Sequence, residues 1–185
     1  YDVHSAENPV TRVIATVYGD KTANFKNQLV WSPTQNFSLT GRAGYFFRET
    51  VRTADLPERY RDFSGGLKMN WDITTDDALQ LNYAFDQYDK SDYQKIRHLD
   101  IRDYSNVQNT FRLLYNHAFE GGDVLTIGSD YMHDYLMNTN LSNGTRKQDT
   151  FDVFAQYDWR ISDQWEMVGA LRYDYFSDGK DSHVT

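Results

Sequence analysis

No cysteine occurs among the 185 residues of the sequence, and no run of about 18 consecutive apolar residues is present. The first absence excludes disulfides, thiolate metal sites and cysteine nucleophiles. The second excludes helices that cross a membrane. The P-loop and the short motifs of zinc proteases, serine hydrolases and dinucleotide-binding enzymes are also missing, and no nucleophile–base pair is evident. We therefore predict that the protein is not an enzyme.

Basic residues are scarce. The 19 Lys and Arg are outnumbered by 27 Asp and Glu, which gives a formal net charge of -8 and an isoelectric point of about 5.0. Because phosphate binding requires a basic surface, nucleic acid is excluded as a predicted partner. The sequence does not begin with a secretory signal peptide. An exported protein would therefore be represented here by a mature or partial chain.

Aromatic residues, by contrast, are abundant: they make up 16% of the sequence, with 14 Tyr and 11 Phe, and they suit β-strands. The mean hydropathy of -0.74 is low, yet a β-barrel needs only every second residue to be apolar. Residues 151–160 and 165–176 alternate in this way, with apolar or aromatic residues at odd-numbered positions and most charges at even-numbered positions. A period of two places the two sets on opposite faces of a sheet.

All four tryptophans lie beside short polar turns. They are Trp31, Trp71, Trp159 and Trp165. A single Trp next to a turn is usually a local packing residue, but here every Trp shares the position. Indole rings favour the membrane–water interface. A row of them at one end of a meander therefore predicts the aromatic belt of a transmembrane β-barrel.

The alternation predicts nine strands joined by short turns at one end and longer polar loops at the other. The strands are residues 10–18, 23–31, 37–50, 61–73, 77–89, 104–119, 123–138, 148–160 and 165–177. The short turns lie near Thr34, Thr75, Gly121 and Asp163, and the long loops are 51–60, 90–103 and 139–147. Outer-membrane barrels show this asymmetry. We predict an all-β, antiparallel up-and-down meander that is a segment of a transmembrane β-barrel. A soluble antiparallel β-sheet ligand-binding module is the main alternative, and a small complete barrel, which needs an even number of strands, is a third.

The clearest resemblance to a known family lies in residues 154–175, which turn from one strand into the next. This hairpin resembles a recurrent one of TonB-dependent outer-membrane receptors, where a strand with an aromatic-Gln and Trp pattern turns and returns with Gly-x-Arg-Tyr-Asp. The return here is Gly169-Ala170-Leu171-Arg172-Tyr173-Asp174. Residues 39–47 and 63–71 look like ordinary barrel strands of the same family.

The resemblance implies a barrel closed by an N-terminal plug in the outer membrane of a Gram-negative bacterium. It also implies import of a bulky, scarce nutrient, driven through TonB, with membrane lipid, TonB and the nutrient as partners. Residues 1–185 show no plug region and no TonB box, so we predict a partial barrel domain that reaches TonB through a missing plug. The strands most resemble cobalamin and haem receptors, which favours haem or a corrinoid over a ferric siderophore. Phe47-Arg48-Glu49-Thr50 begins like the Phe-Arg-Ala-Pro box of haem receptors but lacks Ala-Pro.

The candidate ligand-binding residues lie in the loop predicted at 90–103 and at its border with the next strand. They are His98, Tyr93, Arg97 and Tyr104. An imidazole can ligate haem iron, and tyrosine rings can stack on a flat macrocycle. A solvated surface histidine is the alternative. His117 and His133 share strand faces with aromatic residues and are predicted to face lipid or the interface, so they are poor ligand candidates.

Three carboxylates near the same loop are candidate ligands for calcium. They are Asp92, Asp100 and Asp103. Calcium binds hard oxygen donors of this kind, although the spacing does not match an EF-hand loop. Solvated carboxylates are the alternative interpretation. No resident cofactor is predicted.

Overall fold

The computed structural model describes residues 4–7, 14–17, 19–53, 56–177 and 182–184. Its strands form a nine-stranded antiparallel sheet, in the order β11-β10-β9-β8-β7-β6-β5-β4-β3, and a separate two-stranded sheet, β1-β2. Their bounds are β1 His4–Glu7, β2 Ile14–Val17, β3 Asp20–Thr34, β4 Phe37–Thr53, β5 Leu56–Asp72, β6 Asp77–Gln94, β7 Leu99–Ala118, β8 Val124–Asn138, β9 Thr145–Ser162, β10 Trp165–Phe176 and β11 Ser182–Val184.

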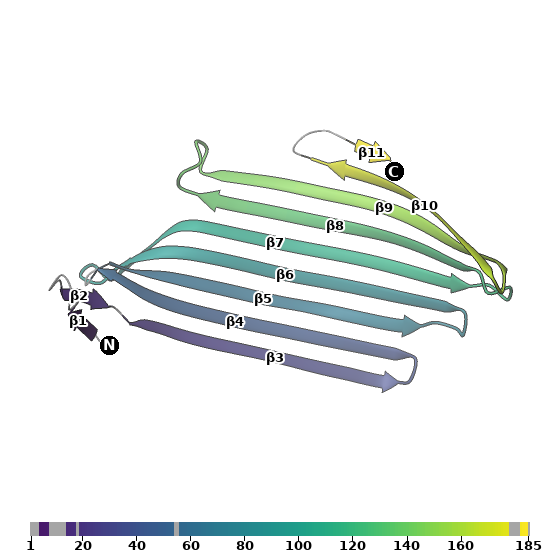
Figure 1. Cartoon of the computed structure of the whole chain (residues 1–185), viewed down its shortest axis with the longest axis horizontal. Helices are drawn as coiled ribbons and strands as arrows, with labels where there is room; N and C mark the ends of the chain where they lie inside the picture. Colours follow the sequence, from purple (N-terminus) through teal and green to yellow (C-terminus); the bar gives the residue numbers. More distant parts are fainter. Residues whose placement is uncertain (1–3, 8–13, 18, 54–55, 178–181, 185) are drawn as a thin grey trace.

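Each strand of the large sheet pairs with the strands next to it in sequence, so the predicted up-and-down meander is confirmed. Figure 1 shows the long strands lying side by side in one curved layer. The sheet is not closed within the described residues, because β3 pairs with β4 alone and β11 pairs with β10 alone. None of the described residues forms a helix long and apolar enough to cross a membrane.

Eight of the nine predicted strands occur in the large sheet, as β3 to β10. The prediction for residues 10–18 was wrong in one respect. The described part of that segment, Ile14–Val17, pairs with His4–Glu7 in the small sheet rather than with the meander. Residues 10–13 and 18 lie outside the described part of the chain. The short strands β1 and β11 lack a clear alternation and were not predicted.

The three long loops were also predicted wrongly, because the strands continue through most of these residues. Strand β4 ends at Thr53 and β5 begins at Leu56, the connection between β6 and β7 spans residues 95–98, and that between β8 and β9 spans 139–144. Polar side chains indicate contact with water, but they leave the backbone hydrogen bonds of a strand intact. Strands β3 to β9 consequently run for 15 to 20 residues, more than the roughly 9–11 that cross a bilayer.

The tryptophans gather at one rim of the sheet, as predicted. Trp31, Trp71 and Trp159 lie near the ends of β3, β5 and β9, and Trp165 begins β10. Because alternate strands run in the same direction, these positions share a rim with the short turns (Figure 1). We call it the Trp rim. The opposite rim, here the far rim, holds the ends of strands in residues 51–60, 90–103 and 139–147.

The register aligns the odd-numbered residues of β3 to β10 on one face, except beyond the bulges near strand ends. We call this the apolar face, and the opposite one the polar face. The apolar face is largely open: Trp165 is 71% exposed and Leu171 is 62% exposed. Among the hydrophobic side chains that the structure describes, Val51 is the one that is buried. A soluble module would bury its tryptophans, so this single layer argues against that alternative.

Candidate ligand-binding site

The predicted ligand histidine lies in a tight turn at the far rim. Residues 95–98 form this turn, and His98 closes it with a left-handed φ of 52°, a conformation uncommon for a residue other than glycine. The Nδ1 atom of His98 lies 3.2 Å from the Tyr93 hydroxyl oxygen, and Arg97 is exposed in the same turn. The guanidinium carbon of Arg59 stands 3.4 Å from the centre of the Tyr93 ring. The structure therefore brings Tyr93, Arg97 and His98 together, but one face of Tyr93 is already covered.

Tyr104 belongs to a different group, on the polar face. Its ring centre lies 5.9 Å from that of Tyr88 in an edge-to-face arrangement, and Tyr88 lies 6.4 Å from Tyr60. The three rings come from β7, β6 and β5. We call them the tyrosine row. Tyr93, which contacts His98, has the parity of the apolar face. Tyr104 lies on the polar face, so the structure does not place it in one cluster with His98.

A buried acid and a lysine accompany the tyrosine row. The Tyr60 hydroxyl donates a hydrogen bond of 2.7 Å to Glu58 Oε2, and the Lys90 ammonium lies 3.1 Å from Glu58 Oε1. Glu58 is only 4% exposed. The hydrogen bond to Glu58 raises the pKa of Lys90, which keeps this lysine cationic. Lys90 stands in register between Tyr60 and Tyr104. The rings suit contact with a flat ligand, and the cation beside them, Lys90, is paired with Glu58 and Asp103.

Sequence reasoning missed Tyr60, Tyr88, Lys90 and Glu58 as members of this group. Tyr88 and Lys90 share strand parity, which could have placed them on one face. Their alignment with Tyr60 and Tyr104 depends on the register between strands, and that register is not evident from parity.

The structure does not gather the predicted calcium ligands. Asp100 pairs with Arg61 and Arg59, whereas Asp103 lies 3.6 Å from the Lys90 ammonium. Asp92 has the parity of the polar face and is exposed. Within the described ranges, no three His, Cys, Asp or Glu side chains form a group that could hold a metal ion.

The two strand histidines take part in similar clusters on the apolar face. His117 Nδ1 lies 2.7 Å from Asp77 Oδ1, which also accepts a hydrogen bond from Tyr115. His133 Nδ1 lies 2.6 Å from Asp149 Oδ1. Both histidines have the parity of the apolar face, as the sequence predicts, and both are held by a carboxylate on the neighbouring strand.

Asp77 should make the stability of the Trp rim depend on pH in the acidic range. It is the first residue of β6, two residues beyond Leu79, the register partner of Trp71. Hydrogen bonds from Tyr115, Thr74 and His117 lower its pKa from 3.8 to about 2. The lowered pKa stabilises the fold above pH 3.8, and this contribution is lost as the pH falls towards 2. We expect Asp77→Asn to flatten the fall in unfolding temperature between pH 4 and pH 2. Parallel pH profiles for the variant and the wild type would contradict this role.

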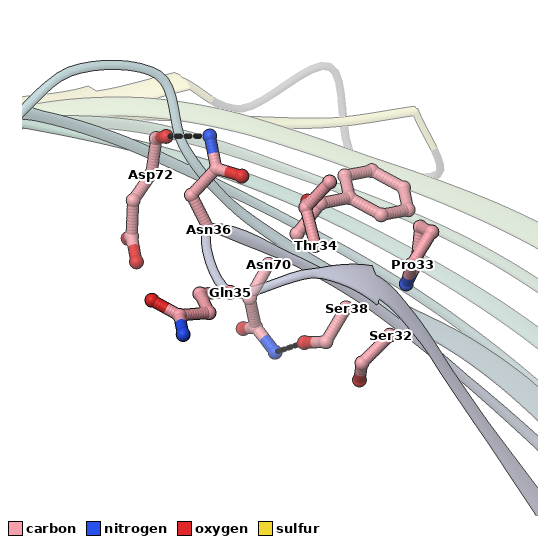
Figure 2. A pocket seen from close by; sticks show the side chains of 9 residues that line it. Ser32, Pro33, Thr34, Gln35, Asn36, Ser38, Asn70 and Asp72 are labelled. Atoms are coloured by element: carbon pink, nitrogen blue, oxygen red, sulfur yellow. Dashed lines mark hydrogen bonds between the residues drawn. The ribbon is translucent and has the colours of Figure 1, made fainter.

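A hollow of about 460 Å³ lies at the Trp rim, where the β3–β4 turn meets the end of β5. Figure 2 shows the amide of Asn36 turned towards Asp72 and that of Asn70 turned towards Ser38. The first amide donates to the Asp72 carbonyl oxygen at 3.1 Å, and the second donates to the Ser38 hydroxyl at 3.2 Å. These bonds tie the turn to β5, which is a structural role.

A comparison of the sequence with known protein families identifies the family of this chain. Residues 11–185 match the β-barrel of the family described as TonB dependent receptor-like. No curated protein gives a significant match to the chain. The meander, the exposed apolar face and this match agree, so the chain belongs to the TonB-dependent receptor β-barrel family. Its members are transport receptors of the Gram-negative outer membrane, not enzymes, and they work with TonB on small-molecule ligands.

Proposed function

We propose that this chain is part of the wall of an outer-membrane barrel that imports a bulky, scarce nutrient in a TonB-dependent manner. The observation that carries the proposal is the exposed apolar face of a single-layer sheet, with all tryptophans at one rim. The Trp rim faces the periplasm and the far rim faces outward. Further strands close the barrel, and a plug preceding the barrel contacts TonB.

The height of the apolar face fits a bilayer. On β5 it runs from Trp71 to Phe63, eight residues or about 26 Å along the strand at about 3.3 Å per residue. A strand tilt of about 40° reduces this to about 20 Å, close to the roughly 25 Å apolar band of such barrels. The strand ends beyond Phe63 then project outside the membrane.

The polar face becomes the inner wall, where a ligand would pass. We assign the tyrosine row and Lys90 to ligand contact, with haem or a corrinoid ahead of a ferric siderophore. A flat macrocycle can stack on one ring of the row and meet the edge of its neighbour, because Tyr88 and Tyr104 are steeply inclined to each other, and Lys90 can attract its carboxylates. The predicted contact through His98 and Arg97 remains a second, outer contact at the tip of the turn.

Replacing both Tyr88 and Tyr104 by Ala should weaken haem or cobalamin binding to the full-length receptor by about tenfold or more, since buried aromatic contacts often contribute over 1 kcal/mol each. Binding is measured by titration of receptor in detergent, and uptake is measured in cells with and without TonB. Tyr135→Ala, at the same rim on the apolar face, is the matched control.

Two outcomes would contradict the proposal. Unchanged binding of haem, cobalamin and ferric siderophores in the double variant would remove the tyrosine row from the site. Growth on these nutrients that depends on neither the receptor nor TonB would end the transport proposal.

A further inference from the structure

Three cations lie on a diagonal across the polar face of β3, β4 and β5, which are side by side in Figure 1. They are Lys26, Arg42 and Lys68. Lys26 is in register with Gly44, two residues from Arg42. Arg42 is in turn in register with Gly66, two residues from Lys68. Diagonal neighbours of this kind stand about 7–8 Å apart, so the three form one group, here called the cationic line.

The cationic line has no acid beside it within the described strands. All three residues are exposed, and among the described residues none of them has a carboxylate within the distance of an ion pair. On β3, β4 and β5, the polar face carries no acid between the levels of Ser64 and Asn70. Neighbouring like charges repel each other. In a chain of net charge -8, three such cations indicate an anionic partner from outside the described residues.

Farther along the sheet, charges on the same level are paired. Through the register of β5 to β9, Lys68 lies in one row with Arg112 and Asp152. Arg112 pairs with Asp130 at 2.6 Å, and Arg172 on β10 pairs with Asp152 at 3.1 Å. The charges of β7 to β10 on this level are therefore held in ion pairs, whereas those of the cationic line are open to a partner.

A hollow of about 500 Å³ adjoins the cationic line on the polar face. Lys26 and Arg42 line one side of it, and the small residues Gly44 and Ser64 lie between the strands that border it. Asp86 on β6 lines the opposite side, three strand spacings or about 14 Å from Lys26. With two cations and one acid, the lining is cationic overall, and an anionic group fits on the β4 side.

The cationic line descends the wall from the tyrosine row towards the Trp rim. Measured by register on β5, the levels of the three cations lie seven, five and three residues from Trp71. At the tilt used above, these levels are about 18, 13 and 8 Å above the interfacial tryptophan. Tyr60 of the tyrosine row lies four residues beyond the first level, or about 10 Å higher. A group that moves down this wall meets a new cation about every 5 Å.

We propose that the cationic line is a transit site for a carboxylate or phosphate group of the imported nutrient. The group leaves the tyrosine row, enters the hollow beside Lys26 and Arg42, and passes Lys68 on its way to the periplasm. This inference rests on the transport function proposed above and adds a property of the nutrient, which carries an anionic group. A wall lined by one sign of charge raises the local concentration of the opposite charge, and exposed cations in series hold the group without trapping it at one position.

The first test measures TonB-dependent uptake by cells that carry the full-length receptor. The probes are haemin and cyanocobalamin, and their counterparts are haemin dimethyl ester, without free carboxylates, and dicyanocobinamide, without the phosphodiester. We expect Lys26→Gln, Arg42→Gln and Lys68→Gln together to reduce uptake of the imported probe about tenfold or more and uptake of its counterpart much less. Lys26→Arg, Arg42→Lys and Lys68→Arg together keep the charges and should restore uptake.

The paired charges of the same level provide the matched control. Arg112→Gln with Asp130→Asn removes one cation and the acid that it contacts, so the net charge of the wall is unchanged and uptake should stay close to that of the wild type. Equal losses for a probe and its counterpart, or an equal loss in this control, would overturn the proposal. A wild type without TonB-dependent uptake would contradict the proposed function instead.

A second measurement does not depend on the nutrient. The sequence has no cysteine, so Gln28→Cys places a single thiol of this chain at an exposed position in register with Arg42. In the full-length receptor this thiol should react about tenfold faster with an anionic than with a cationic methanethiosulfonate reagent. The three glutamine substitutions should abolish the preference. Equal rates with both reagents would overturn the proposal, and so would a thiol that reacts with neither, because a plug that covers the line leaves no path for the nutrient.

Discussion

Leu171→Arg is expected to destabilise the protein folded in a bilayer by about 2–4 kcal/mol, the cost of a cation near the midplane on the lipid side of a barrel. Leu171 is 62% exposed on the apolar face. It lies four residues from Met167, the register partner of Trp159, and thus about 10 Å above the interfacial tryptophan at the tilt used above. Urea titration of the full-length receptor folded into vesicles measures the change.

The neighbouring residue provides a matched control. Ala170→Arg introduces the same side chain on the polar face, where it meets water, and should have a much smaller effect on insertion. Arg172→Leu, also on the polar face, should likewise be milder for insertion than Leu171→Arg. Similar insertion losses for Leu171→Arg and Ala170→Arg would show that the two faces are assigned incorrectly.

Asp89→Ala should loosen the projecting strand ends. Asp89 is 1% exposed and accepts hydrogen bonds from Ser105 at 2.6 Å and Gln87 at 3.0 Å, in addition to its contact with Arg102. Removing it leaves the buried Ser105 hydroxyl without this acceptor, which costs about 1–3 kcal/mol. Hydrogen exchange of the β6 and β7 amides at the far rim should become faster.

Asp92→Ala is the control for this change, because Asp92 is exposed at the same rim. It should leave the exchange rates of β6 and β7 close to those of the wild type. If the β6 and β7 amides exchanged at the same rate in both variants, the buried network around Asp89 would have no special role in holding the strand ends.

Alternation was sufficient to predict the two faces, because a period of two maps directly onto the sides of a strand. It failed where a bulge inserts a residue. Lys90 pairs with Tyr104 but Ser91 pairs with Arg102, so Asp103 is the extra residue in β7. Beyond it the parity reverses, and Asp100 and Arg102 join the apolar side. Asp92 and Asp100, two of the predicted calcium ligands, therefore share a parity but lie on different faces.

The extent of the strands could not be predicted from polarity. Residues 90–94 and 99–102 are largely polar, yet residues 90–94 pair across the hairpin with Tyr104 and residues 99–102. A side chain outside the membrane has no need to be apolar, so the sequence pattern weakens at the interface while the backbone ladder continues. The tyrosine row could not be predicted either, because it depends on the register of three strands.

The meander has a consequence for how the chain reaches the membrane. Every strand from β3 to β11 pairs with its immediate neighbours in sequence, so each contact closes a hairpin and the contact order between adjacent elements is low. Such a sheet can grow by one hairpin at a time, with each finished strand presenting its free backbone groups as the template for the next. Within the described residues β3 and β11 each keep one unpaired edge, and these are the edges at which further strands would add before the apolar face is sealed in lipid.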